Sequence, residues 1–244
     1  ITLANYTKDL IQDQLYVGSY LLLSFLSFMP GVFLFFFKNV ENVQEDSLKE
    51  GNVRNLKSIV LQPRFLQAIT AAAFAYAVMS FLMTATPLSM HVMENMSLKE
   101  TGLVLQFHVV AMFLPSLITG NLIKKYGHSA IIYGGVLFFF ITVLLSLFEQ
   151  TYLNYMLSLI FLGLGWNFLF ISGTSLVVLT YNKEEKFKVQ GINDLIVFST
   201  MALASLSAGI LLNSIGWKMM NLICIPFLVL IILVSFMADK KSVS

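Results

Sequence analysis

Seven apolar stretches, each long enough to cross a lipid bilayer as a helix, constrain this chain more than any other feature. A helix needs about 20 residues to cross the hydrocarbon layer. The stretches are Leu15–Phe37, Phe65–Leu88, Thr101–Ile123, Ser129–Phe148, Tyr152–Tyr181, Val189–Asn213 and Met219–Met237. They are apolar all round, whereas strands of an outer-membrane barrel would be about 10 residues long and alternate in polarity. The sequence therefore predicts an all-α, polytopic membrane protein with seven transmembrane helices.

The composition agrees with this prediction and excludes other classes of protein. Of the 244 residues, 57% are hydrophobic and only 11% are charged, whereas a soluble domain carries about 25% charged residues. The formal net charge is +2, so we expect no nucleic-acid partner. Cys224 is the only cysteine, which excludes an internal disulfide and a thiolate metal cluster. We expect no cofactor and no metal.

The distribution of basic residues predicts the orientation of the helices. Twelve of the 15 basic residues fall in loops on one side of the predicted membrane: Lys38, Lys49, Arg54, Lys57, Arg64, Lys124, Lys125, Lys183, Lys186, Lys188, Lys240 and Lys241. The opposite loops hold only Lys8, Lys99 and Lys218. Because cytoplasmic loops are enriched in Lys and Arg, the N-terminus of this chain is expected outside and the C-terminus in the cytoplasm.

A single long polar connection divides the chain into one helix and a group of six. It is rich in charged and amide side chains, and we expect it to end in a short surface helix at Leu56–Leu61. Pro63 then starts the next helix, where its missing N–H costs nothing. The expected segments are an outside loop at 1–14, a helix at 15–37, a cytoplasmic central linker at 38–64, a six-helix half at 65–238 and a cytoplasmic tail at 239–244.

Several short motifs resemble a bacterial branch of the major facilitator superfamily. The loop GNLIKKYGH, between the second and third helices of the six, resembles the loop signature of that superfamily at Gly120, Lys124, Lys125 and Gly127. Lys124 stands where an acidic residue is usual. The other matching segments are MTATPL at 83–88, QFHVVAMF at 106–113, GLGWNF at 163–168 and VQGIND at 189–194.

This resemblance implies that the seven helices are the sixth to twelfth of a twelve-helix secondary active transporter. Such a protein moves a small molecule by alternating access, as two six-helix halves rock around a central site. The chain would then be a fragment in the bacterial inner membrane, lacking the first five helices, and its partners would be the lipid bilayer and the missing N-terminal half. Since no Lys or Arg lies at mid-depth in a predicted span, we expect a neutral or amphipathic solute, with proton coupling left open.

Five residues are the candidates for contact with the solute. Polar side chains inside the hydrocarbon layer usually face protein or a water-filled cavity. Asn167 lies at the midpoint of its predicted span, and Trp166 beside it could offer a flat stacking surface. The alternative is that Asn167 joins helices by hydrogen bonds and that Trp166 faces lipid. Gln106, His108 and Tyr76 complete the set.

Proton coupling or gating has three candidates, Asp194, Asn193 and His108. Asp194 is the only carboxylate well inside a predicted span, and it either carries a proton or latches to Lys186, Lys188 or a neighbouring loop. His108 titrates in the neutral range when exposed, but it could equally make a packing hydrogen bond between helices.

Two further classes of protein are weaker alternatives. A seven-helix retinal pump would need a lysine in the middle of its last helix, and Met219–Met237 contains none; a seven-helix receptor or sensor would not explain the isolated first helix. An intramembrane enzyme would need a second buried carboxylate, a Ser–His pair or a zinc motif. The segment HVME, which begins at His91, lacks the second histidine of a zinc-protease helix. We therefore expect a transporter and not an enzyme.

Overall fold

The computed structural model describes residues 6–7, 10–11, 16–36 and 54–243. These described residues form helices and no strand, which confirms the all-α prediction. The chain divides into two compact units, Ile1–Asn52 and Val53–Ser244. Most of the predicted outside loop and most of the predicted central linker lie outside the described residues.

The first unit contains one long helix, α2 (Val17–Phe36), which corresponds to the first predicted span. Apart from the buried Gly18, its side chains are exposed or half-buried within the structure, although nearly all of them are apolar. A helix that is apolar all round is typical of a membrane span. The prediction of a membrane helix here therefore agrees with its length and its surface.

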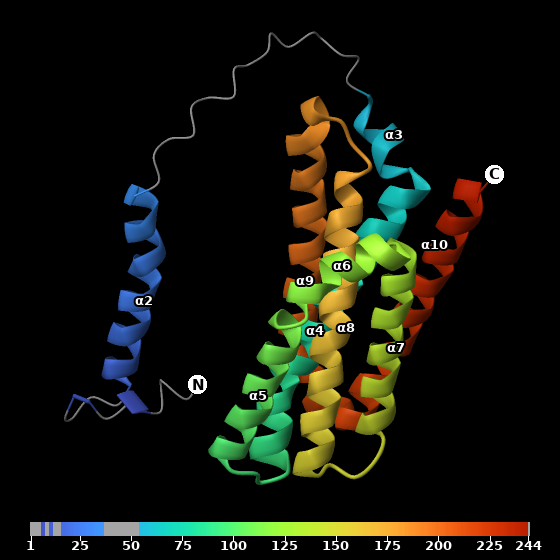
Figure 1. Ribbon diagram of the computed structural model, residues 1–244. Coiled ribbons are helices and arrows are strands. Elements are labelled where there is room, and N and C mark those ends of the chain that lie inside the picture. The colour runs from blue at the N-terminus through green and yellow to red at the C-terminus, as the bar shows by residue number, and fades with distance from the viewer. Residues whose placement is uncertain (1–5, 8–9, 12–15, 37–53, 244) are drawn as a thin grey trace. The chain divides into compact units, whose positions relative to one another are not determined.

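The second unit is a bundle of helices joined by short connections (Figure 1). Its elements are α3 (Leu56–Val60), α4 (Pro63–Pro87), η1 (Leu88–Met93), α5 (Leu98–Phe113), α6 (Ser116–Tyr126), α7 (His128–Ser146), α8 (Tyr152–Val178), η2 (Lys183–Glu185), α9 (Lys186–Ile223) and α10 (Ile225–Val243). The core lies around α4 and α8, because α4 packs against α8, α9 and α10 while α8 also packs against α5 and α7. The short helix expected at Leu56–Leu61 is α3, and Pro63 is the first residue of α4.

The bundle has two ends, which we name after one residue at each. At the Arg64 end, uppermost in Figure 1, α4 begins, α6 meets α7, α8 meets α9 and α10 finishes. At the Tyr155 end, η1 leads into α5 and α7 leads into α8. α10 continues as helix through Val243, so the predicted tail begins with helical residues.

Gly216 reverses the chain between the last two predicted spans. The segment Lys183–Lys241 is a continuous helical stretch of 59 residues, nearly three times what one crossing needs. Gly216 interrupts it with φ 75° and ψ 170°, backbone angles that are accessible to glycine and strained for other residues. Trp217 then packs its ring on Tyr155, with ring centroids 5.2 Å apart, while Asp239 reaches Arg64 at the other end. The stretch therefore crosses the bundle twice.

The remaining spans match the predicted positions, with a break in one of them. Among the described residues, five helical stretches are long and apolar enough to cross a membrane, or six if α5 and α6 form one bent span. The bend between α5 and α6 is about 40° and lies at Pro115, which lacks the N–H needed to continue α5. Counting two crossings around Gly216 restores the seven predicted spans.

Small residues let the central helices approach closely. A Cβ added at Gly173 of α8 would lie 2.7 Å from the Ala68 carbonyl oxygen and 2.9 Å from the Ala72 nitrogen of α4. A Cβ at Gly163 of α8 would lie 2.6 Å from the backbone oxygen of His108 on α5. Backbone contact of this kind is the usual way in which membrane helices associate, and it fixes α4, α5 and α8 relative to one another.

Candidate functional site

Asn167 holds α8 to the bend between α5 and α6. Its Nδ2 donates to the Met112 carbonyl at 2.6 Å and to Ser116 Oγ at 2.7 Å, and its Oδ1 accepts from Thr119 Oγ1 at 2.6 Å. The side chain is fully buried. The Met112 carbonyl would bond to the N–H of Ser116 in an unbroken helix, so the Asn167 amide takes over one backbone group at the break, as neighbouring helices do in bent membrane helices. This geometry matches the alternative in which Asn167 joins helices.

Trp166 and Tyr76 meet in a cluster of five rings, which we call the central aromatic cluster: Tyr76, Phe113, Trp166, Phe170 and Phe198. Trp166 and Phe170 are stacked, with centroids 4.9 Å apart and planes at 15°. Tyr76 meets both edge-on, at 5.3 and 5.0 Å. Such pairs are favoured arrangements of aromatic rings. The cluster thus joins α4, α5, α8 and α9.

His108 ties α5 to α8. Its Nδ1 lies 2.7 Å from the Leu159 carbonyl, and since a carbonyl only accepts, Nδ1 carries the proton and donates. The side chain is fully buried, and Nε2 has no hydrogen-bond partner among the described residues. Gln106, two residues earlier on α5, is half-buried. The structure therefore gives His108 the packing hydrogen bond that was one of its two predicted roles.

Asp194 and Asn193 lie side by side near the start of α9. Asp194 is exposed and accepts from Asn193 Nδ2 at 3.0 Å. Asn193 is buried, and its Oδ1 has no partner among the described residues. In the part of the chain that the structure describes, no ion pair joins Asp194 to Lys186 or Lys188.

The loop motif forms the turn between α6 and α7. Gly127 has φ 83° and ψ 161° and is both the C-cap residue of α6 and the N-cap residue of α7. Lys124 and Lys125 are exposed in the last turn of α6, and Lys125 Nζ lies 4.8 Å from the centroid of the Tyr126 ring. Gly120 has open space around it. The motif therefore shapes a tight turn at the Arg64 end.

A polar network at the same end was not predicted. Arg64 donates to Asp239 Oδ1 at 2.8 Å and to Gln67 Oε1 at 2.7 Å. Ser129 donates to Asp239 at 2.6 Å and accepts from Gln67 at 2.8 Å, while Tyr133 reaches the second Asp239 oxygen at 3.3 Å. Three helices, α4, α7 and α10, are joined in this way. The one indication in the sequence was Asp239, which follows the last apolar run and lies at the start of the predicted cytoplasmic tail.

A second ion pair fastens the segment before α3 to the loop before α9. Arg54 Nη2 lies 2.7 Å from Glu185 Oε2, and both the backbone N–H and Nε of Arg54 donate to Oε1 at 3.0 Å. Arg54 also donates to the Thr180 carbonyl at 3.0 Å, and the Asn182 N–H donates to Glu185 at 2.9 Å. The hydrogen bonds from Arg54 and then from Asn182 lower the pKa of Glu185 from its ordinary 4.5 to about 2, so this carboxylate stays ionised at neutral pH.

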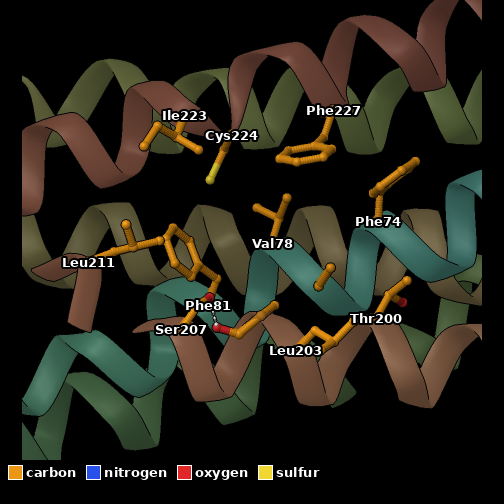
Figure 2. Close-up of a pocket in the computed structure, with 12 residues that line it drawn as sticks. Phe74, Val78, Phe81, Thr200, Leu203, Ser207, Leu211, Ile223, Cys224 and Phe227 are labelled. Carbon is orange, nitrogen blue, oxygen red and sulfur yellow. Dashed lines mark hydrogen bonds between the residues drawn. The ribbon is translucent and has the colours of Figure 1, made fainter. Parts of the chain in front are cut away.

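An apolar cavity of about 480 Å³ lies between α4, α9 and α10 (Figure 2). Val78, Phe81 and Cys224 are its buried residues, and its lining among the described residues has no charged side chain. The hydroxyls of Thr200 and Ser207 line it too, but both donate to backbone carbonyls of their own helix. The cavity therefore offers apolar surface without a hydrogen-bonding group that lacks a partner.

The cavity and the central aromatic cluster lie on different faces of α4. Val78 follows Tyr76 by two residues, which turns it by roughly 200° around the helix axis. Figure 2 shows Phe74, Val78 and Phe81 directed at the cavity, and Tyr76 is not among its lining residues. The bundle therefore has two separate candidate regions at similar depth, the central aromatic cluster and the apolar cavity.

The chain is similar to known membrane transporters over most of its length. The profile of the Major Facilitator Superfamily matches residues 14–185 and 69–244. The riboflavin transporter RfnT of Brucella anthropi is 35% identical over 93% of this chain and 57% of its own length. Two uncharacterized MFS-type transporters of Bacillus subtilis are also similar: YdeG is 26% identical over 84% of this chain and 50% of its own length, and YddS is 32% identical over 64% of this chain and 37% of its own length.

These relatives are longer than the chain described here, which spans about half of their length. The matching profile and the transporter names of these relatives favour a transporter over the receptor and intramembrane-enzyme alternatives. With its helical bundle and its apolar spans, the chain belongs to the Major Facilitator Superfamily, a family of multi-pass membrane transporters and not of enzymes.

Proposed function

We propose that this chain forms the C-terminal half, with one preceding helix, of a secondary active transporter that moves a small neutral or amphipathic solute by alternating access. The observation that carries the proposal is the match of a six-crossing bundle to relatives that are about twice as long. In this family the site lies between two such halves near the middle of the bilayer. The N-terminal half would be its main protein partner.

We propose riboflavin, or a molecule of similar size with a flat ring system, as the solute. The relative with 35% identity over 93% of this chain carries riboflavin in its name. The interior of the bundle supports a neutral solute, because the cations of the two ion pairs described above, Arg54 and Arg64, lie at the Arg64 end. A fixed cation at mid-depth would instead favour an anionic solute.

The membrane would be the bacterial plasma membrane, with the Arg64 end in the cytoplasm. Exposed lysines gather at that end: Lys57, Lys124, Lys125, Lys183, Lys186, Lys188, Lys240 and Lys241. An excess of basic residues is typical of the cytoplasmic side. Labelling of single cysteines placed at Lys186 and at Lys99 with an impermeant reagent in intact cells should modify only the Lys99 position; modification of the Lys186 position alone would reverse the orientation.

Uptake by the full-length protein tests the transport proposal. Purified protein in proteoliposomes should accumulate or exchange riboflavin above protein-free vesicles, and unlabelled riboflavin should compete. Absence of both uptake and exchange in correctly inserted protein would contradict the proposed solute.

Proton coupling is tested in the same vesicles by imposing a pH gradient. If Asp194 carries the proton, Asp194→Asn abolishes gradient-driven accumulation and leaves exchange intact. Asn193→Ala tests the neighbouring candidate separately, since it removes the hydrogen bond to Asp194 without removing the carboxylate. Unchanged accumulation by Asp194→Asn would exclude Asp194 as the proton carrier.

A further inference from the structure

The central aromatic cluster has the depth expected of a solute site. Tyr76, Phe113, Trp166 and Phe198 each lie within three residues of the middle of their crossing segments, which run over 63–93, 98–126, 152–178 and 186–215. Four helices therefore bring rings to one level, near the middle of the bundle. In a membrane-spanning bundle this level corresponds to the centre of the hydrocarbon layer.

The cluster is closed on one side and open on the other. Trp166 is only 4% exposed, and Tyr76 and Phe170 are half-buried. Phe113 on α5 and Phe198 on α9 are 59% and 49% exposed, although each packs its ring against the buried members. Aromatic surface is thus presented between α5 and α9, with the rings of α4 and α8 behind it.

The buried indole of Trp166 has an unused donor. Its Nε1 has no hydrogen-bond partner among the described residues, whereas a buried tryptophan N–H usually has one. A donor left without a partner costs free energy unless something outside this chain accepts from it. An acceptor on the edge of a flat molecule lying on these rings would meet that need.

A second group of rings shows that aromatic packing alone does not produce these features. Phe138 on α7 and Phe161 and Phe168 on α8 form an α7–α8 aromatic cluster, in which the Phe138 centroid lies 5.8 Å from that of Phe161 and 5.3 Å from that of Phe168. It joins two helices instead of four, and it contains only phenylalanines, so it has no polar atom. We attribute to it packing between α7 and α8.

We infer that the central aromatic cluster is the stacking surface for a planar, fused-ring heteroaromatic solute, with Trp166 Nε1 donating a hydrogen bond to an acceptor at the edge of that ring system. Tyr76, Phe113 and Phe198 supply the ring contacts around it. The inference rests on the proposed function, because it assigns a place to the solute of the same transporter. Stacking on aromatic side chains is the common way in which proteins hold flat heterocycles without a fixed charge.

Binding of riboflavin to the purified full-length protein tests the inference independently of transport. Riboflavin fluoresces, and we expect its emission to fall when the ring system stacks on the aromatic surface formed by Tyr76, Phe113 and Phe198. Titration gives the Kd of the wild-type protein. Tyr76→Leu should raise the Kd about tenfold or more because it removes a ring contact, and Trp166→Leu should do the same because it removes both the ring behind Tyr76 and the N–H donor.

Two further variants distinguish the contribution of the Trp166 hydrogen bond from that of its ring, and the central aromatic cluster from aromatic packing elsewhere in the bundle. Trp166→Phe keeps a ring and removes only the N–H, so it should raise the Kd by about threefold to tenfold. Phe168→Leu removes a ring from the α7–α8 aromatic cluster and should leave the Kd within about twofold. Thermal unfolding of every variant shows whether the bundle is intact.

The outcomes distinguish the site from the function. Folded Tyr76→Leu and Trp166→Leu proteins that bind riboflavin as tightly as wild type would overturn the site while wild-type uptake still supports the function. Wild-type protein that binds riboflavin at the cluster but does not carry it would contradict the function alone. Wild-type protein that neither binds nor carries riboflavin would overturn both.

Discussion

The Arg64 end and the middle of the bundle are held together by different interactions. At the Arg64 end, Arg54–Glu185 and Arg64–Asp239 join segments that are more than 130 residues apart in the chain. In the middle, rings join α4 to α8, the hydrogen bonds of Asn167 join α8 to the α5–α6 bend, and Trp166 Nε1 has no partner among the described residues. Charged groups at the end bind one another, whereas closer to the middle the buried atoms Trp166 Nε1 and His108 Nε2 have no hydrogen-bond partner among the described residues.

This difference indicates that the ends and the middle of the helices have different roles. Ion pairs with several hydrogen bonds fix the positions of helix ends, because their geometry is directional. Ring and methyl contacts are less directional, so a region built from them can accept a flat molecule with small side-chain movements. The predictions that follow test whether the end and the middle differ in this way.

The largest effect is expected where the backbones of α4 and α8 touch, between the Arg64 end and the middle of the bundle. Gly173→Ala would place a Cβ 2.7 Å from the Ala68 carbonyl oxygen of α4, and overpacking of this kind costs about 1–3 kcal/mol or more. We expect a clearly lower Tm in the full-length protein, measured by intrinsic fluorescence. Gly191→Ala is the matched control, because a Cβ there has open space; an equal Tm for the two variants would contradict close packing at Gly173.

The next effect is expected at the network around Asp239. Asp239→Asn removes the charge that Arg64 binds, and Arg64→Ala removes the donor to both Asp239 and Gln67. Each should destabilise the protein by about 1–3 kcal/mol, and the double variant should cost less than the sum of the two because the residues interact. Glu149→Gln, at an exposed loop position of the Tyr155 end, should leave the Tm unchanged. Additive losses would show that the network does not act as a unit.

A smaller effect, visible only in acid, is expected from Glu185. Its folded pKa of about 2 lies below the ordinary 4.5, so the stability it contributes is fully present above about pH 4.5 and is lost as the pH falls towards 2. Glu185→Gln should therefore lower the Tm by a constant amount between pH 5 and 8, and the difference from wild type should shrink below pH 4.5. A difference that changed between pH 6 and 8 would contradict this assignment.

The smallest effect is expected at the apolar cavity. Ala204→Val adds two methyl groups to the lining, and filling a cavity changes stability by about 1 kcal/mol or less in either direction. The Kd for riboflavin should stay within about twofold of wild type. A tenfold weaker Kd in the folded variant would move the solute from the central aromatic cluster to the cavity.

Most of the fold could be predicted from the sequence, because each span carries its own signal. A run of apolar residues is sufficient to mark a helix in a membrane, and α2, α4, α7 and α8 lie within a few residues of the predicted stretches. Pro63 and Gly127 also act locally, at the start of α4 and between α6 and α7. Gly216 lies between the predicted spans Val189–Asn213 and Met219–Met237, although the helix continues almost without interruption on both sides.

The candidate site could be predicted only in part. Trp166 and Tyr76 were named from the sequence, but their contact and the participation of Phe113, Phe170 and Phe198 depend on how four helices pack. The sequence left Asn167 between solute contact and hydrogen bonds that join helices; in the structure its Oδ1 and Nδ2 both bind to the α5–α6 bend. One sequence does not reveal which neighbour satisfies a buried amide.

The sequence by itself determined that the chain is a set of membrane-crossing helices and approximately where the crossings lie, because the cost of placing polar groups in hydrocarbon acts residue by residue. Only the tertiary structure decided which side chains meet. Arg64 and Asp239 are 175 residues apart, and Tyr76 meets Trp166 where α8 packs against α4. Contacts between helices depend on the rotation and spacing of whole segments, and local sequence does not encode either of these.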